Sequence, residues 1–307
     1  VQVTAANRLS GVETITIDTQ SDADLSFVAT TGLQTLSISG SGTLAGASIG
    51  QHSGKATSLT ISLTGLEGGF SASAITKLSS DLTVSGTNFD GDMFFETITA
   101  SGLTVTMGSK QDFHADSIYA ENFTLDGAAS TSSTTSADIS LGAVTGSASI
   151  TISLGAGTGV AAATNLNSNG AITVDSSGFG GKLNMPTMSG SGITVSMGAA
   201  GDFSATTINS AKTFTLDGSN SASSNVTQSI IEASTDATMS LGSGTGSLSV
   251  LTRLSAGGTA VIEGSKGGAT MDVFSLTASG ATISLSTIGD FSASTVLTND
   301  GAFVFHL

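Results

Sequence analysis

The 307-residue sequence contains no cysteine and no tryptophan, and it has one proline and one tyrosine. The absence of cysteine excludes a disulfide scaffold, a thiolate zinc site and a cysteine nucleophile. No run of 18 apolar residues occurs, so no transmembrane helix is expected. The chain begins Val1-Gln2 without a methionine or a signal peptide, so we expect a processed protein or a fragment of a longer one.

Basic residues are also scarce. The chain has 8 Lys and Arg against 23 Asp and Glu, which gives a net charge of −15. Nucleic-acid backbones and anionic lipids both require a basic patch, so neither is an expected partner. An acidic surface suits an exported protein that meets divalent cations, and it equally serves solubility alone. Both interpretations stay open at this point.

Small residues dominate what is present. There are 40 Gly, and Ser and Thr together make up about a third of the chain. The hydrophobic share of 38% is nevertheless too high for a disordered linker, because these side chains need burial. The composition therefore predicts a folded chain with many turns.

One short segment, which we call the repeated phrase, occurs three times with its apolar residues retained and its polar residues changed. It reads GLTVTMGSKQDFHA at 102–115, GITVSMGAAGDFSA at 192–205 and GATISLSTIGDFSA at 280–293, with spacings of 90 and 88 residues. Self-similarity at a fixed period is the signature of a repeat architecture. We expect one elongated repeat domain over 1–307, with units at about 1–101, 102–191 and 192–279 and a partial unit at 280–307.

A second pair of similar segments has a longer spacing. ISLGAVTG at 139–146 returns as MSLGSGTG at 239–246, which is 100 residues later rather than 90. The difference predicts an insertion of about ten residues near 219–236, in the form of a loop that extends from a regular scaffold.

Short apolar stretches that alternate with Thr or Ser recur every ten to thirteen residues, for example TITI, LTIS and LTVT. Period-two alternation bounded by Gly, Ser or Asp-Gly indicates strands. The favoured fold is all-β, a parallel β-solenoid of roughly 13 coils and roughly 60–70 Å length at ~4.8 Å per coil. The alternative is a row of tandem immunoglobulin-like sandwiches. Such sandwiches usually need a buried Trp or a tyrosine corner. They would also not show sequence similarity at half the length of one domain.

In a stack of coils, residues at one repeat position lie above each other. The phenylalanine of the repeated phrase is therefore expected to fill comparable interior sites, and the residue that ends the preceding strand should line the same core. The two sets are Phe70, Phe113, Phe203 and Phe291, and Leu63, Met107, Met197 and Leu285.

Aspartates beside glycines or at the start of the repeated phrase are the candidate metal ligands. Such residues coordinate Ca²⁺ through carboxylate and backbone oxygens, or they accept hydrogen bonds from their own turn. FDGD at 89–92 is the strongest candidate, because two carboxylates converge there. The calcium nonapeptide of β-rolls is absent. The candidates are Asp90, Asp92, Asp112, Asp126, Asp202, Asp217 and Asp290.

No catalytic constellation stands out. GASIG at 46–50 matches the G-x-S-x-G pattern, but that signal needs a strand that leads into a helix. The three histidines, His52, His114 and His306, share no motif. The acidic residues are scattered, one to a turn, rather than paired as in a glycoside hydrolase. The chain is therefore expected not to be an enzyme.

The phrases VDSSGFGGKL (174–183) and TLSISGSGTL (35–44), with the lack of Cys and the abundance of Thr, Ser and Gly, resemble bacterial surface-layer and large secreted adhesin proteins. The resemblance implies an exported, non-catalytic β-solenoid that assembles side by side into lattices or fibres, commonly with Ca²⁺. The sequence departs from that family in lacking a recognisable cell-wall anchoring module.

Taken together, the sequence predicts a non-enzymatic extracellular structural protein that self-assembles into a surface layer or filament. The alternative is a receptor-binding module of a phage tail fibre or adhesin, which would lie on a virion or cell surface. The expected partners are copies of the chain and a cell-surface glycan, without membrane insertion. The apolar ends, VQV at 1–3 and GAFVFHL at 301–307, are expected to meet neighbouring subunits or to continue into more chain.

Overall fold

The structure is a computed structural model that describes residues 2–5, 13–29, 33–51, 58–63, 66–76, 80–87, 89, 91–108, 112–127, 138–198, 201–220, 225–242, 246–264, 270–285, 290–299 and 301–306. These residues form 26 β-strands and no helix. Accordingly, no described segment is a helix that could cross a membrane.

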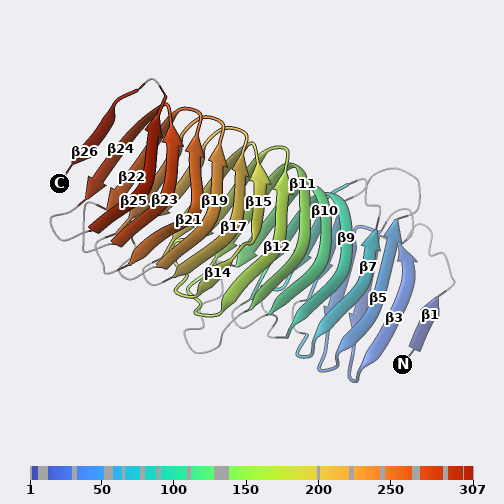
Figure 1. The fold of residues 1–307 in the computed structure, drawn as a ribbon. Coiled ribbons are helices and arrows are strands. Elements are labelled where there is room, and N and C mark those ends of the chain that lie inside the picture. Colours follow the sequence, from blue (N-terminus) through green and yellow to red (C-terminus); the bar gives the residue numbers. More distant parts are fainter. Residues whose placement is uncertain are drawn as a thin grey trace.

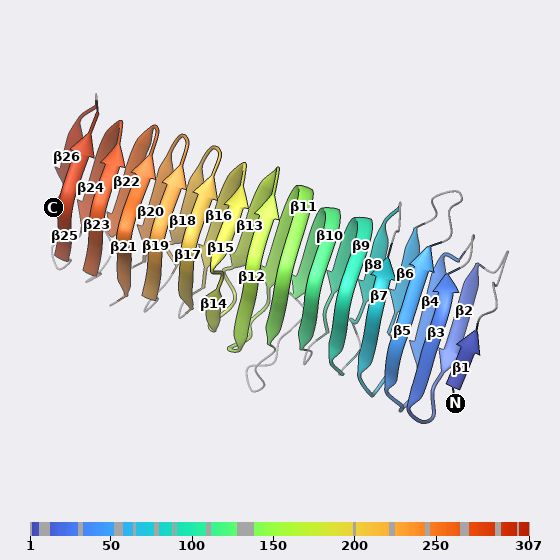
Figure 2. The ribbon, with the colours of Figure 1, turned by 45° about the vertical axis from the view of Figure 1, so that its right-hand side comes forward.

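The strands stack into one rod with two parallel ladders (Figures 1 and 2). Ladder 1 consists of β1 (Gln2–Ala5), β3 (Ala23–Ala29), β5 (Leu44–Gln51), β7 (Phe70–Thr76), the first halves of β9 (Met93–Thr106), β10 (Phe113–Gly127) and β11 (Ile139–Leu154), β12 (Val160–Ser168), β14 (Lys182–Asn184) with β15 (Thr187–Gly190), β17 (Asp202–Ser210), β19 (Asn225–Ala233), β21 (Ser247–Ala256), β23 (Thr270–Ala278) and β25 (Asp290–Thr298).

Ladder 2 closes the other side of every coil. It consists of β2 (Thr14–Asp18), β4 (Thr35–Ser39), β6 (Leu59–Ser62), β8 (Leu82–Ser85), the second halves of β9, β10 and β11, β13 (Ala171–Ser176), β16 (Gly192–Met197), β18 (Phe214–Gly218), β20 (Ala237–Leu241), β22 (Thr259–Gly264), β24 (Gly280–Leu285) and β26 (Phe303–His306).

Each ladder has fourteen levels, slightly more than the roughly 13 coils expected. Partners in successive levels are 20 to 27 residues apart, as in Phe113↔Met93 and Thr124↔Thr151. Every strand pairing is parallel, and a sandwich of antiparallel sheets would not produce this pattern. The β-solenoid predicted from the alternation is therefore confirmed, and the immunoglobulin-like alternative is wrong.

The ladder 1 strands bend in the middle. In β17 the side chains of Phe203, Ala205 and Ile208 are buried, while Thr206 and Thr207 both face outward, so the inward phase shifts between Ala205 and Ile208. One level before, Pro186 occupies this bend and separates β14 from β15. Its carbonyl accepts hydrogen bonds from the backbone N–H groups of Thr206 and Thr207 at 2.9 and 2.8 Å. Proline cannot donate to a ladder, so a bend is where a stacked coil tolerates it.

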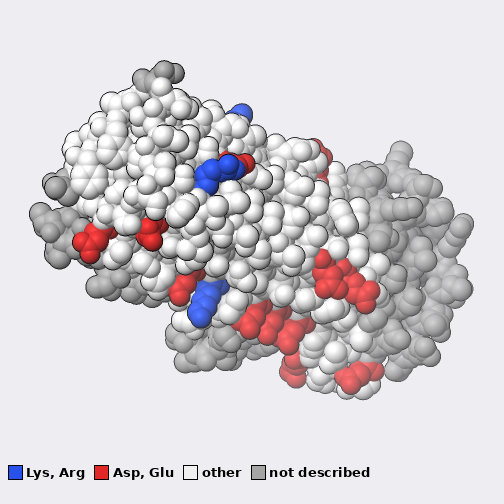
Figure 3. Space-filling view, in the orientation of Figure 1, with Lys and Arg blue, Asp and Glu red and all other residues white. Residues whose placement is uncertain are grey.

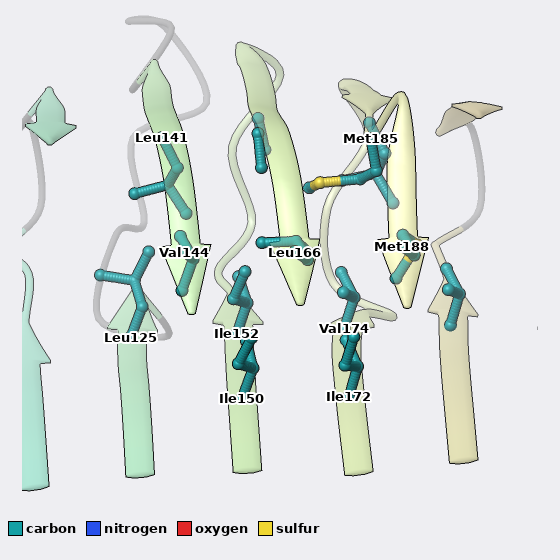
Figure 4. Close-up of a cluster of buried hydrophobic side chains, with 14 of the residues drawn as sticks. Leu125, Leu141, Val144, Ile150, Ile152, Leu166, Ile172, Val174, Met185 and Met188 are labelled. Atoms are coloured by element: carbon teal, nitrogen blue, oxygen red, sulfur yellow. The ribbon is translucent and has the colours of Figure 1, made fainter. Parts of the chain in front are cut away.

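The interior is a single apolar layer between the two ladders. Figure 4 shows Leu141, Val144 and Leu166 from ladder 1 facing Ile150 and Ile152 from ladder 2. These side chains are almost completely buried. Because every strand alternates inward and outward residues, the period-two pattern in the sequence becomes one inner wall and one outer wall.

The repeated phenylalanines lie in one column of ladder 1, as predicted. Phe70, Phe113 and Phe203 are at most 1% exposed, and Phe291 is partly buried in the last described coil. Phe113 to Phe203 and Phe203 to Phe291 are each four coils, so the ~90-residue super-repeat is a set of four coils. The predicted strand-end residues of the same core, Leu63, Met107, Met197 and Leu285, are all buried.

The segment 219–236, where a loop insertion was predicted, contains a regular strand. Half of that segment is strand β19, which pairs with β17 and β21 at regular levels of ladder 1. The two similar segments that suggested an insertion lie at different positions of the coil. Ile139 begins β11 in ladder 1, whereas Met239 lies in β20 of ladder 2. The strands of both ladders alternate apolar residues with Ser or Thr. Similar short sequences therefore occur at positions of the coil that are not equivalent.

One inward residue breaks the apolar rule. Gln228 lies in β19 between Ala205 and Val250, and it is fully buried. Neither its amide nitrogen nor its carbonyl oxygen has a hydrogen-bond partner among the described residues. A buried polar group without a partner costs its desolvation free energy, about 1–3 kcal/mol.

We therefore expect Gln228→Leu to raise the free energy of unfolding by about 1–3 kcal/mol, because the substitution removes the unsatisfied amide. Urea unfolding followed by circular dichroism measures the change as a shift of the midpoint. Thr227→Val, on the outer side of the same strand, should stay within about 0.5 kcal/mol of the wild type. An unchanged or lower midpoint for Gln228→Leu would contradict the expectation.

Candidate functional surfaces

Aspartates mark the edge of the rod where the ladder 1 strands begin. Each accepts a hydrogen bond from a backbone N–H of the following coil: Asp112 from Asp138 at 2.8 Å, Asp138 from Val160 at 2.8 Å and Asp202 from Asn225 at 3.0 Å. Asp22 does the same for Thr43 at 2.9 Å. Asp236, at the start of the ladder 2 strand β20, does so for Thr259 at 2.7 Å. These residues, which we call the corner aspartates, join one coil to the next.

The corner aspartates explain part of the surface charge. In Figure 3, acidic side chains gather along the lower edge of the rod, and few basic ones accompany them. Figure 1, in the same orientation, shows that the ladder 1 strands begin at this edge. Asp92, Asp112 and Asp138 occupy this edge in three successive coils, and Asp92 accepts a long hydrogen bond from the Asp112 N–H at 3.4 Å.

The stacking of these three carboxylates changes the pKa of the middle one, Asp112. Burial raises the pKa of its carboxyl group above the usual value, and the negative charges of Asp92 and Asp138 raise it further, against the lowering effect of the Asp138 N–H. A raised pKa means that the folded state holds the proton more tightly than the unfolded state. The stability linked to this proton is complete below the unfolded pKa of 3.8 and is lost as the pH rises through the folded pKa.

We expect Asp112→Asn to be more stable than the wild type at neutral pH, because the amide keeps a hydrogen-bond acceptor for Asp138 and removes the charge repulsion. The difference in melting temperature should shrink as the pH falls toward 4. Thermal unfolding of both proteins between pH 3 and 7 tests this, and Asp290→Asn, on an exposed edge, serves as the control. A difference that grows as the pH falls would show that the sign is wrong.

The other predicted metal ligands fall in different environments. Asp217 accepts a hydrogen bond from the Ser219 N–H in its own turn at 3.0 Å, which is the turn role considered from the sequence. Asp126 lies in ladder 2 between Thr106 and Ser153. Asp290 is the exposed first residue of β25, and Asp90 lies outside the described residues. Asp112 and Asp202 do not cap their own turns; they bind the next coil.

The predicted cation sites do not converge in the part of the chain that the structure describes. No group of three or more His, Asp or Glu side chains there is arranged to hold a metal ion. The pairing predicted in FDGD cannot be placed, since it includes Asp90. The corner aspartates nevertheless form an edge of stacked carboxylates, and calcium binding stays a prediction.

The sequence motif with catalytic form has no matching geometry. Ser48 of GASIG lies inside strand β5, paired with Ser26 and Ala74, and not on a strand-to-helix turn. On ladder 1, His114 Nε2 lies 2.8 Å from Asp116 Oδ1, and the His114 ring stacks on Phe94 with centroids 4.6 Å apart. Ser140 occupies the next level, but no described hydrogen bond joins it to His114. A nucleophile requires such a bond to its base.

One hollow on the described part of the rod is shallow and open. It has a volume of about 470 Å³ and lies over β14, β17 and β19. The residues that line it include Lys182, Leu183, Asp202, Phe203 and Asn225. Asp202 is already engaged by the backbone N–H and the side-chain amide of Asn225, at 3.0 and 3.1 Å. The hollow is therefore an irregularity between coils rather than a converging set of reactive groups.

Ladder 2 carries the most regular surface of the molecule. Its central outward position is threonine at twelve of fourteen levels and valine at the other two, and we call this set the threonine column. Its members are Thr14, Thr35, Thr60, Thr83, Thr104, Thr124, Thr151, Thr173, Thr194, Thr215, Thr238, Val261, Thr282 and Val304.

The threonine column was not predicted from the sequence. The stretches LTIS, LTVT and ITVS showed that Thr alternates with apolar residues. Because the coils differ in length, the sequence did not show that these threonines lie in one column. Only the strand register places residues 20 to 27 positions apart side by side.

Comparisons with known proteins add no assignment. Neither the protein-family models, nor the curated protein sequences, nor the solved structures contain a match to this chain. Any functional proposal therefore depends on the geometry and the surface chemistry of the rod.

Proposed function

We propose that this chain is a non-enzymatic extracellular structural protein that self-assembles into a surface layer or filament. The observation that carries the proposal is the stack of fourteen parallel levels that the described residues form. A rod of about 60 Å at ~4.8 Å per coil has long regular sides, which suit repeated lateral contacts.

The uncovered apolar face belongs to β25 and β26. Its inward residues Phe303 and Phe305 are 46 and 41% exposed. Phe305 continues the inward column of Ile283, which is fully buried. Exposed apolar groups next to an open strand edge favour the addition of another β-structure. We propose that this face stacks against a second copy or against a further coil of the same protein.

The net charge of −15 opposes association between copies, because like charges repel. Divalent cations bind carboxylates and reduce that repulsion. In the proposed assembly, calcium acts along the corner aspartates, with Asp112 between two neighbouring carboxylates as the first place to bind it.

Electron microscopy and sedimentation of the purified protein, with calcium and after chelation by EGTA, test the proposal. The wild type should form sheets or filaments that dissociate on chelation. Phe305→Asp should remain monomeric, whereas Phe274→Asp, at a more exposed site on the side of the rod, should assemble as the wild type does. A wild-type protein that stays monomeric at high concentration with calcium would overturn the proposal.

A further inference from the structure

The threonine column is chemically uniform although it packs against no core. Its side chains point away from the interior, since they alternate with buried residues such as Val84 and Val105. Inward positions are uniform because packing selects them. An outward position has no such constraint, so a single residue type at twelve of fourteen levels needs another cause.

The outward columns of ladder 1 serve as an internal comparison. They share the parallel strands and the stacking of the same coils, yet their residues are mixed. One runs Ser71, Phe94, His114, Ser140, Ala162, Asn184, Ser204, Thr227, Ser249, Asp272, Ser292, and another runs Thr99, Tyr119, Thr145, Asn167, Ser189, Asn209, Glu232, Ser255, Thr277, Leu297. A general preference of strands for threonine therefore does not explain the threonine column.

A second outward column of ladder 2 lies two residues further along each strand, and it completes a two-dimensional array. In the first five coils it is also purely hydroxylic, so both columns are free of charge there. These coils read Thr-x-Thr or Thr-x-Ser at 14–16, 35–37, 60–62, 83–85 and 104–106.

Acidic residues enter the second column only at later levels, and their carboxylates are engaged locally. Asp175 and Asp217 accept hydrogen bonds from the N–H groups of their own turns, each at 3.0 Å. Glu263 accepts one from the Ser240 hydroxyl at 3.3 Å. The first five coils are therefore the most regular and least charged part of this face.

The dimensions of the array follow from strand geometry. Neighbouring strands are ~4.8 Å apart and alternate residues are ~6.7 Å apart along a strand, so hydroxyl and methyl groups form a flat rectangular lattice. The χ1 angle of threonine is restricted in strands, which fixes both groups in advance. The oxygen lattice of ice has repeats of similar size on its prism faces. Liquid water, dissolved sugars and unfolded chains present no such rigid lattice.

We propose that the ladder 2 face, centred on the threonine column of the first five coils, binds the surface of ice. The hydroxyl groups would take positions of the water lattice, and the methyl groups would order the water between them. Pre-ordered side chains lose little conformational entropy on binding, so many weak contacts add up over the rod. This activity does not depend on self-assembly, because it uses the side of a single rod.

The test is the freezing behaviour of the purified wild-type protein, measured as the gap between melting and freezing points and as protein incorporated into a slowly grown ice hemisphere. The wild type should show a freezing gap and enter the ice. Thr83→Lys with Thr104→Lys should lose most of both effects, because the lysines disrupt the lattice.

Ser71→Lys with Thr99→Lys is the matched control, since it adds the same charges to the same coils on ladder 1. It should keep both effects, and the melting temperature of each variant shows that the rod is folded. A folded wild type that neither enters ice nor changes its growth would overturn the proposal. Equal loss in both double variants would do so too, as would a ladder 2 variant that loses only self-association in sedimentation while it still enters ice.

Discussion

Phe113→Ala is expected to lower the free energy of unfolding by about 3–5 kcal/mol, because the substitution removes buried apolar surface and leaves a cavity. Phe113 is fully buried in the central part of the rod. Its ring lies 5.7 Å from that of Phe95, which in turn lies 5.7 Å from that of Phe70, so the variant also loses an aromatic contact. Urea unfolding measures the loss.

The effect should also be local. The strand contacts of β10 are with β9 and β11, the neighbouring levels. In a stack where each coil contacts only its neighbours, a defect destabilises the adjacent coils first. Amide hydrogen exchange should therefore accelerate over 93–154 and remain nearly unchanged over 247–264. Phe274→Ala, whose side chain is 56% exposed, should leave both measurements close to the wild type. A uniform acceleration along the whole rod would contradict this expectation.

Gly170→Ala is expected to be the second largest change, a loss of about 1–3 kcal/mol. Gly170 lies at the corner between β12 and β13, where successive coils touch through their backbones. A Cβ atom there would overlap the carbonyl oxygen of Ala148 in the preceding coil. A backbone atom within a stacked coil cannot rotate away, so the coils would have to separate.

Gly192→Ala provides the matched control. Gly192 lies at the next corner of the same ladder, paired with Ala171, but the nearest atom to its added Cβ is the Thr213 hydroxyl at 3.7 Å. This is an ordinary contact distance, so the variant should be as stable as the wild type within about 0.5 kcal/mol. Equal midpoints for the two glycine variants in urea would show that the coils are not packed as closely as the structure has them.

The sequence predicted those features that depend on local alternation. Inward and outward residues follow a period of two within each strand, so the strands, the all-β solenoid and the buried column of Phe70, Phe113 and Phe203 could be found without the structure. The predicted number of coils was also close to the observed number, because the spacing of turns in the sequence determines it.

Features that depend on the register between coils could not be predicted. Successive levels are separated by anything from 20 to 27 residues, because the loops differ in length. The bonds from Asp112 and Asp202 to the following coil were therefore missed, and Ile139 was matched with Met239 although they lie in different ladders. The threonine column was hidden for the same reason.

The central claim is that one parallel register carries the ladder 2 array along the whole rod, and a distance measurement tests it most directly. The chain has no cysteine, so spin labels attach only at Thr60→Cys and Thr215→Cys. These positions are seven coils apart in the threonine column, which predicts a single distance near 34 Å at ~4.8 Å per coil. A broad distribution, or a distance that does not grow by about one coil when Thr238→Cys replaces Thr215→Cys, would contradict the account.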